Sequence, residues 1–275
     1  MAKKYLGMDL GLDMGEKITS IQHANKIISR STWIALGMGT LNLILAFVFL
    51  KGSDGLGTEP RIAANQEYMK YFKDKKFILS FVIGLIFLGV SFVVNVYAVN
   101  YAARSASNSV TDLILSNTPF YNVDGIFVYG AVLLVLVIFL VCFLKPQRFP
   151  FILKSIALFT LIRSFFLSLT HISPYPEHIA ISPSIFTTLF PSIFTGDDLF
   201  FSGHTGLPFL IALVFWDNPL LRTIFLAFSL LLSIVVLLGH LHYSIDVASA
   251  FFITFTIFML AKSLFKRDWE ILKNG

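Results

Sequence analysis

Charged residues and cysteine are both scarce in this sequence. Only 13% of its residues are Asp, Glu, Lys or Arg, and 56% are hydrophobic, whereas soluble domains contain roughly 25% charged residues. This composition excludes an ordinary soluble domain and predicts a polytopic membrane protein. The single cysteine, Cys142, lies inside an apolar run. An intrachain disulfide is therefore excluded, and cysteine usage gives no information about the redox compartment.

Two sequence patterns are also missing. Residues 1–31 are polar and carry charges of both signs, so we expect no cleavable signal peptide there. The chain has no His-Glu-x-x-His motif and offers no fixed fourth ligand beside its histidines and aspartates, so we expect no metal site and no organic cofactor. The net charge of +5 is explained by its placement in particular loops and does not indicate a nucleic-acid partner.

Long apolar runs dominate the rest of the sequence. About 20 apolar residues are needed for one helical crossing of a bilayer. We expect an all-α, polytopic membrane helical bundle, with six core transmembrane helices in one domain at 77–265. The core runs cover 77–99, 125–144, 149–170, 200–217, 220–239 and 245–264. A polar tail at 1–31 and one extra apolar segment at 32–50 precede this domain, and a short cytoplasmic tail at 266–275 follows it.

The distribution of Lys and Arg predicts the orientation in the membrane. The loops at 100–124, 171–203 and 239–244 contain one basic residue, Arg104, and the alternate loops hold the others. We therefore expect the loops that are poor in Lys and Arg to face the extracytoplasmic or lumenal side. Seven crossings would also place the N-terminus there, although residues 1–31 contain five basic residues. Either the apolar segment at 32–50 is re-entrant or interfacial, or the tail crosses despite its charge.

Two histidine-containing motifs lie where polar loops meet apolar runs. The first is Ser-Gly-His-Thr at 202–205, and the second is His-Tyr-Ser-Ile-Asp-Val at 242–247. Two apolar runs joined by a Trp-Asp-Asn-Pro turn at 216–219 separate them. If each run crosses the membrane once, both motifs emerge on the same side, at the N-terminal ends of two helices.

These residue types suit phosphate chemistry. A helix N-terminus attracts anions; Ser202 is a good cap for it and Gly203 permits close approach of a ligand. His242 and Asp246 are four positions apart and so share one helical face. The carboxylate can hold one imidazole nitrogen protonated and leave the other as a nucleophile. His204 can protonate a leaving alkoxide and later deprotonate an acceptor hydroxyl.

Arg163 lies inside an apolar run. Because a charge in such a run is costly, it is a candidate functional residue. We expect it to reach a phosphate below His204 and His242. The alternative is an arginine that extends to the membrane surface or pairs with a carboxylate.

The two motifs resemble the catalytic motifs of the type 2 phosphatidic acid phosphatase superfamily, and most closely its sphingomyelin synthase-like branch. The resemblance is strong over about residues 155–260, faint over 77–150 and absent before 76. A weaker match joins Arg163, Thr170, Pro174 and Pro176 to the third-span motif of that branch. Two positions depart from the pattern. Ser244 replaces a Thr, and the Cys of the branch's Cys-Gly-Asp motif is absent in either possible alignment.

The resemblance also bears on the substrate. Phosphatases of this superfamily usually carry an Arg six residues before the second histidine, where this chain has Val236, and Arg163 is followed by Ser164 instead of Pro. Fewer cations favour a phosphodiester with one negative charge over a phosphomonoester. Asp197 and Asp198, beside aromatic residues that include Tyr243, can receive a choline or ethanolamine cation. The alternative is that they form a solvated acidic turn.

We therefore expect an integral membrane lipid phosphotransferase, in a bacterial plasma membrane or an endomembrane. It would move a phosphocholine- or phosphoethanolamine-type headgroup from a phospholipid donor to a lipid alcohol, such as ceramide or diacylglycerol. The predicted catalytic residues are His204, His242 and Asp246, with a phospho-histidine intermediate. A lipid phosphatase or phospholipase C-like hydrolase with the same site is one alternative, and a non-enzymatic lipid transporter is another.

Overall fold

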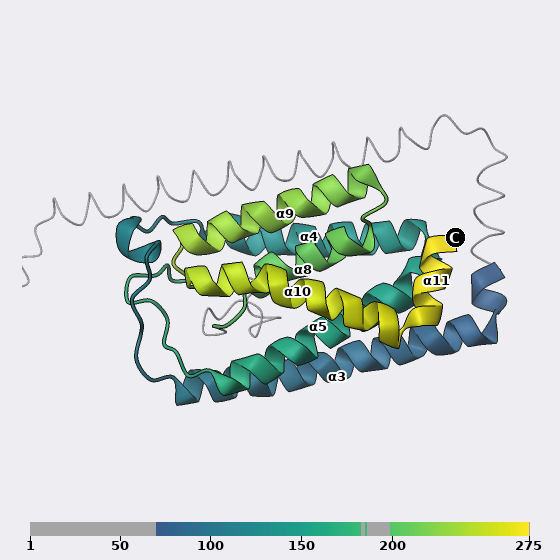
Figure 1. Cartoon of the computed structure of the whole chain (residues 1–275), viewed down its shortest axis with the longest axis horizontal. Coiled ribbons are helices and arrows are strands. Elements are labelled where there is room, and N and C mark those ends of the chain that lie inside the picture. The colour runs from purple at the N-terminus through teal and green to yellow at the C-terminus, as the bar shows by residue number, and fades with distance from the viewer. Residues whose placement is uncertain (1–69, 183–184, 186–198, 275) are drawn as a thin grey trace, which may run out of the picture. The chain divides into compact units, whose positions relative to one another are not determined.

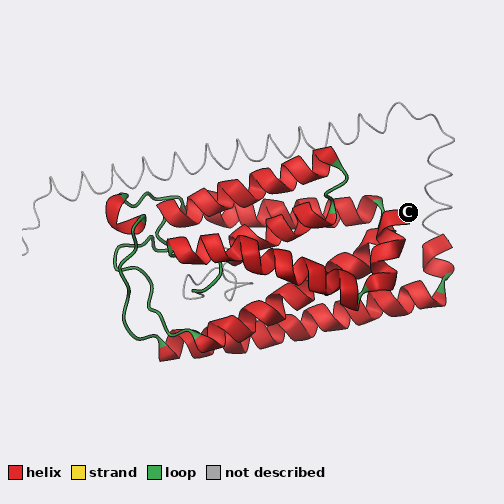
Figure 2. Cartoon of the chain, in the orientation of Figure 1, coloured by secondary structure: helices red, strands yellow, loops and turns green. Residues whose placement is uncertain are grey.

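The computed structural model describes residues 70–182, 185 and 199–274, and the regular structure of these residues is entirely helical (Figure 2). Five helical segments are long and apolar enough to cross a membrane. The expectation of an all-α polytopic membrane bundle is confirmed. The predicted tail at 1–31 and apolar segment at 32–50 lie outside the described residues. In chain order the elements are α3 (Lys75–Ser105), η1 (Leu115–Asn117), α4 (Asp124–Leu144), η2 (Pro146–Arg148), α5 (Phe149–Leu169), α8 (Gly203–Val214), α9 (Pro219–Leu238), α10 (Ser244–Leu264) and α11 (Lys266–Asn274).

Helix α8 is much shorter than the apolar run at 200–217 in which it lies. Its 12 residues span about 18 Å at about 1.5 Å per residue, against a hydrocarbon thickness of about 30 Å. The chain before it is not helical, and Phe200 adopts a φ of 90°, which no α-helix accommodates. The fourth of the six predicted core spans is therefore a short helix inside the bundle. Its apolar composition reflects burial against other helices.

Helix α3, in contrast, extends beyond the predicted run at 77–99. The Asp74 side chain accepts a hydrogen bond from Lys76 N and caps its first turn, and the helix continues through the polar residues up to Ser105. Hydropathy marks the part of a helix that lies in the hydrocarbon layer, whereas hydrogen bonding decides where the helix ends. The apolar run therefore did not predict the last turn and a half of α3, after residue 99.

Helix α8 occupies the centre of the described bundle. It packs against α9, α10, α5 and α4, while α3 packs along α5 (Figure 1). A Cβ atom added to Gly206 would lie 2.7 Å from Thr254 Oγ1 and 2.8 Å from Phe159 Cε2. The side chains of Ser229 and Ser233 hold α9 against α8, since Ser229 Oγ donates to the Thr205 carbonyl at 2.9 Å and Ser233 Oγ lies 3.0 Å from Thr205 Oγ1. These contacts fix the position of the residues that begin α8.

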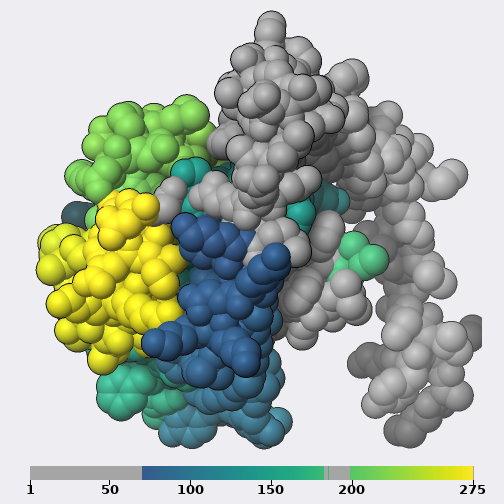
Figure 3. Space-filling model, turned by 90° about the vertical axis from the view of Figure 1, so that its right-hand side faces the viewer, coloured from purple at the N-terminus to yellow at the C-terminus, as the bar shows by residue number. Residues whose placement is uncertain are grey.

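A buried ion pair joins the bundle to its C-terminal helix. Lys154 Nζ of α5 lies 2.6 Å from Asp268 Oδ2 and 2.7 Å from Ser80 Oγ, and Ser80 Oγ also donates to Asp268 Oδ1. Figure 3 shows α11 beside the N-terminal part of α3. A buried charge of this kind is stable only when a partner compensates it. The segment predicted as a polar tail at 266–275 is thus a docked helix up to Asn274.

The opposite end of the bundle contains three loops, at 106–123, 170–182 and 239–243, which we call the loop end. Backbone hydrogen bonds connect them directly: Ser107 N donates to His171 O at 2.9 Å, Tyr121 N to Leu238 O at 2.8 Å and Ile179 N to Gly239 O at 3.1 Å. Segments far apart in the sequence therefore form one hydrogen-bonded layer at the end where α10 begins (Figure 1).

Candidate active site

His242 and Asp246 form a buried pair at the start of α10. His242 Nδ1 lies 3.3 Å from Asp246 Oδ2, and the two side chains are 2% and 1% exposed. The same Oδ2 accepts a hydrogen bond from Tyr243 N at 3.0 Å, which also caps the helix. Because a carboxylate only accepts hydrogen bonds, Nδ1 carries the proton in this pair. The lone pair of the neutral imidazole is then on Nε2.

The N-terminus of α8 is bonded directly to the same segment. Ser202 N donates to the backbone oxygen of Asp246 at 3.0 Å. The Ser202 side chain accepts a hydrogen bond from Thr205 N at 3.4 Å and so caps α8. The two motifs are therefore neighbours in the fold, and the first turn of α8 starts beside the first turn of α10.

The His204 side chain lies in that first turn of α8. Its ring is 4.3 Å from the ring of Phe127, between centroids, at an interplanar angle of 44°. Phe127 belongs to a buried cluster that also contains Leu241 and Val247, which flank the segment from His242 to Asp246. His204 therefore packs on the apolar cluster that supports the second motif, and it is itself buried.

Arg163 of α5 reaches the N-terminus of α8. Its Nε donates to the Phe201 carbonyl at 3.0 Å, and a Cβ added to Gly203 would lie 3.2 Å from the same Nε. The absence of a side chain at Gly203 thus permits the guanidinium to lie against the backbone. A buried cation and a helix N-terminus both attract anions, and here they are adjacent.

Tyr243 has a different environment from the one expected for a residue that contacts a headgroup. It is almost fully buried; its hydroxyl donates to Ser173 O at 2.8 Å and accepts from Val110 N at 3.3 Å. Burial raises the pKa of this phenol. The side chain joins the start of α10 to two loops of the loop end. Asp197 and Asp198 lie outside the described residues.

Asp112 is an important residue of this region that the motifs did not indicate. Its Oδ2 accepts from Ser244 N at 2.7 Å and Ser244 Oγ at 2.8 Å, and its Oδ1 accepts from Ile114 N and Leu115 N. Burial raises the pKa of this carboxyl, but the four hydrogen bonds outweigh burial and hold the pKa below its usual value. The sequence signal is weak, because an Asp before a short turn is common in loops.

His240 is the second such residue. It has a φ of 51° and ends α9 in a Schellman motif, in which Leu241 N donates to Val236 O. Its ring nitrogens lie 2.6 Å from Glu177 O and 3.1 Å from Thr118 O. Glycine usually occupies this left-handed position. This helix end differs because it has a histidine there, whose imidazole contacts two other loops.

Comparison with known families supports the motif assignment. Residues 196–263 match the family model described as PAP2 superfamily C-terminal. The match supports the type 2 phosphatidic acid phosphatase (PAP2) superfamily. The PAP2 match includes both histidine motifs and the helices α8, α9 and most of α10. No curated protein and no solved structure matches the chain.

The PAP2 match supports an enzyme of the lipid phosphatase or phosphotransferase kind, and the apolar helices support an integral membrane protein. Within the described part of the chain, no group of three or more His, Cys, Asp and Glu side chains is arranged to hold a metal ion. The residues brought together by direct contact at the starts of α8 and α10 are Arg163, Ser202, Gly203, Tyr243, His242 and Asp246.

Proposed function

We propose that this protein is a membrane lipid phosphotransferase of the sphingomyelin synthase-like branch of the PAP2 superfamily. It transfers a phospho-headgroup of the phosphocholine or phosphoethanolamine type from a phospholipid to a lipid alcohol, such as ceramide or diacylglycerol. The observation that carries the proposal is the buried pair of His242 and Asp246 beside the N-terminus of α8, which Arg163 also contacts.

In the first step, His242 Nε2 attacks the phosphorus of the donor and the bond to the glycerol oxygen breaks. His204, as an imidazolium, donates its proton to the departing oxygen, and diacylglycerol leaves. The headgroup phosphate remains on Nε2. Asp246 accepts the hydrogen bond from Nδ1 and stabilises the positive charge that the ring acquires.

In the second step, the now neutral His204 removes a proton from the hydroxyl of the acceptor lipid. The acceptor oxygen attacks the phosphorus, the bond to Nε2 breaks and His242 returns to its starting form. Arg163 and the backbone N–H groups that begin α8 stabilise the negative charge on the phosphoryl oxygens in both steps.

The low number of cations supports a phosphodiester donor. At the position six residues before His242, Val236 is completely buried in the apolar cluster that also contains Phe127. A second arginine therefore does not contribute from this position. One guanidinium and one helix N-terminus suit a phosphate with one negative charge better than a monoester with nearly two.

The reaction is tested with purified protein in mixed micelles that contain headgroup-labelled phosphatidylcholine or phosphatidylethanolamine. Ceramide and diacylglycerol are supplied in parallel reactions. His242→Ala is the inactive variant, and His171→Ala, which removes an exposed histidine away from the motifs, is the matched control. We expect label on the added lipid alcohol with wild type and His171→Ala, and none with His242→Ala.

The other outcomes identify the alternatives. Label released only as a water-soluble headgroup phosphate would make the protein a hydrolase with the same site. An acid-labile label trapped on the protein when the acceptor is omitted, and absent in His242→Ala, would support the phospho-histidine intermediate. No turnover of diester or monoester lipids would refute the enzymatic proposal and favour a non-enzymatic lipid transporter.

The extracytoplasmic or lumenal position of the site is also part of the proposal. It rests on the scarcity of basic residues at 100–124, 171–203 and 239–244, which contain only Arg104, in the last turn of α3, against the Lys- and Arg-rich alternate loops. A single cysteine introduced at Ser116, in a Cys142→Ala background, should react with a membrane-impermeant maleimide from the extracytoplasmic side of intact cells or spheroplasts. Labelling only after permeabilisation would reverse the orientation.

A further inference from the structure

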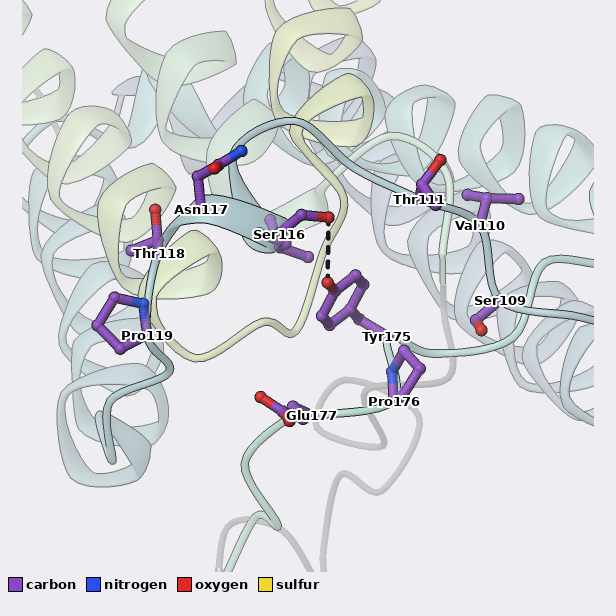
Figure 4. Close-up of a pocket in the computed structure, with 11 residues that line it drawn as sticks. Ser109, Val110, Thr111, Ser116, Asn117, Thr118, Pro119, Tyr175, Pro176 and Glu177 are labelled. Carbon is purple, nitrogen blue, oxygen red and sulfur yellow. Dashed lines mark hydrogen bonds between the residues drawn. The ribbon is translucent and has the colours of Figure 1, made fainter.

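The loop end contains a cavity of about 620 Å³ whose lining includes neither His204 nor His242 (Figure 4). One wall is the α3–α4 loop and the other is the segment that follows α5. The lining residues are Ser109, Val110, Thr111, Leu115, Ser116, Asn117, Thr118, Pro119, Tyr175, Pro176 and Glu177. The hydroxyl groups of Ser116 and Tyr175 join the two walls at a distance of 3.2 Å.

The chemistry of the lining excludes an anion and favours a cation. It offers four aliphatic hydroxyl groups, one phenol, one amide and one carboxylate, but no Lys, Arg or His. Glu177 is the charged group of this lining, and its backbone carbonyl is fixed by the ring of His240 at 2.6 Å. Oxygen acceptors around a single carboxylate suit a group that carries positive charge and several N–H donors.

A primary ammonium fits this lining better than a quaternary one. Its three N–H groups need oxygen acceptors, which Glu177, Ser116 and Thr118 can supply. Quaternary ammonium groups are typically bound by cages of several aromatic rings, and among the lining residues Tyr175 alone is aromatic.

Residues that line the cavity also contact Tyr243, the residue between His242 and Ser244. Leu115 packs with Tyr243 in one buried cluster, the Tyr175 and Tyr243 rings are 6.1 Å apart, and Val110 N donates to the Tyr243 hydroxyl. Asp112 adds a second connection, because it bonds both to Leu115 N and to Ser244. A ligand in the cavity therefore contacts loops that position the start of α10.

We propose that this cavity binds a primary ammonium group, with Glu177 as its counter-charge. The group comes either from an aminoethyl lipid headgroup or from a free amine, and the two share the same recognition chemistry. The identification of the donor headgroup as one source rests on the proposed function, whereas binding to the cavity does not require catalysis.

Binding is measured first, without turnover. Ethanolamine is titrated into the detergent-solubilised protein by ligand-observed NMR, with choline and glycerol as competitors of different chemistry. We expect ethanolamine to bind at least about threefold more tightly than choline, and Glu177→Gln to weaken it by about threefold to fivefold, the upper part of the range for an exposed ion pair. Glu270→Gln, an exposed carboxylate on α11, should bind like wild type.

Two results would overturn the proposal. One is equal ethanolamine binding by wild type and Glu177→Gln when both variants show the same melting temperature. The other is binding of choline or glycerol as tight as that of ethanolamine. Loss of lipid turnover alone would refute the proposed function and leave the binding result standing.

A kinetic arm then distinguishes the two sources of the amine. If the cavity holds the donor headgroup, ethanolamine competes with a phosphatidylethanolamine donor, and Glu177→Gln raises KM for that donor more than KM for phosphatidylcholine. If it holds a free amine, ethanolamine changes kcat for both donors equally and Glu177→Gln abolishes this effect. Either pattern supports an ammonium site.

Discussion

The Asp112 carboxylate accepts two hydrogen bonds from Ser244 through a single oxygen, one from the backbone N at 2.7 Å and one from Oγ at 2.8 Å. Its other oxygen accepts from Ile114 N and Leu115 N at 2.9 and 3.0 Å. One buried side chain thus connects the η1 turn to the first residue of α10, two positions after His242. This geometry supports a role for Asp112 in positioning the start of α10, and not in proton transfer.

Asp112→Asn tests that role. Both carboxylate oxygens of Asp112 accept hydrogen bonds, whereas the Asn side chain has one oxygen. Its NH₂ group would replace the other oxygen and would face backbone N–H groups that are themselves donors. We expect kcat to fall by about 10- to 100-fold, because a small displacement of His242 misaligns the attack, and stability to fall by about 1–3 kcal/mol. Headgroup transfer and thermal unfolding in detergent measure the two effects.

A matched control separates position from a general loss of a carboxylate. Asp74 caps α3 through Lys76 N and is exposed, so Asp74→Asn should retain nearly full activity. Equal activity of the two variants would show that the bond from Asp112 to Ser244 does not hold the catalytic segment in place.

The same carboxyl predicts a pH dependence of stability. Burial raises the pKa of Asp112, but the hydrogen bonds from Leu115, Ser244 and Ile114 together lower it by more. The folded-state pKa therefore lies below the usual 3.8. A lowered pKa means that the ionised form stabilises the folded state above pH 3.8 and that this contribution is lost as the pH falls through the folded-state value.

The measurement is the difference in melting temperature between wild type and Asp112→Asn from pH 7 to pH 3. We expect a constant difference from pH 7 to about 5 and a decrease below about 4, because only the wild-type residue can be protonated. A difference that grows as the pH falls would contradict the sign of this shift.

Much of this architecture follows from local sequence patterns. Apolar runs revealed the long helices because a crossing needs a minimum length of such residues. The spacing of His242 and Asp246 predicted a pair on one helical face. His242 Nδ1 and Asp246 Oδ2 lie 3.3 Å apart, but α10 begins at Ser244, so His242 reaches Asp246 from the residue before the N-cap and not from a helical face. Arg163 was a candidate because a charge in an apolar run is costly, and it reaches the start of α8, where its Nε lies 3.0 Å from Phe201 O. Each inference used the hydropathy or the spacing of one short stretch of sequence.

The features that remained hidden depend on contacts between distant parts of the chain or on single dihedral angles. Asp112 and Ser244 are 132 positions apart, and nothing in the sequence of either polar loop indicates that the two residues are in contact. The short length of α8 depends on the φ of 90° at Phe200, which hydropathy does not report. The Lys154–Asp268 ion pair turns a polar C-terminal segment into a docked helix, and it joins two elements that the sequence treats separately.

Gly203 and Gly206 allow the catalytic and packing roles of α8 to be separated. A methyl group at 203 would lie 3.2 Å from Arg163 Nε, whereas one at 206 would lie 2.7 Å from Thr254 Oγ1 and 2.8 Å from Phe159 Cε2. Gly203→Ala must therefore displace the guanidinium by a few tenths of an ångström, and Gly206→Ala must push α8 away from two neighbouring helices.

We expect Gly203→Ala to lower kcat/KM by about tenfold with little change in melting temperature, because charge stabilisation at the phosphate depends on position. Gly206→Ala should lower stability by about 1–3 kcal/mol, the usual cost of overpacking. Steady-state kinetics and thermal unfolding on the same preparations measure both. If Gly203→Ala unfolds at the lower temperature of the two, close packing and not the arginine accounts for the glycine there.

His240 provides the last test, because two of its properties can be removed one at a time. Its φ of 51° requires a left-handed residue, and its ring lies within hydrogen-bond distance of Glu177 O and Thr118 O. His240→Gly keeps the backbone conformation and removes both side-chain contacts, whereas His240→Ala removes the contacts and adds about 1–2 kcal/mol of strain.

Stability should therefore decrease from wild type to His240→Gly and again to His240→Ala. Hydrogen exchange should become faster in the peptides that contain Thr118 and Glu177 in both variants, since the loops lose a common anchor, while peptides of α11 at the far end of the bundle exchange as before. The ion pair between Lys154 and Asp268 holds that end independently. If His240→Ala were as stable as His240→Gly, the left-handed backbone at this position would not persist in solution, and it would not hold the imidazole beside the two carbonyl groups.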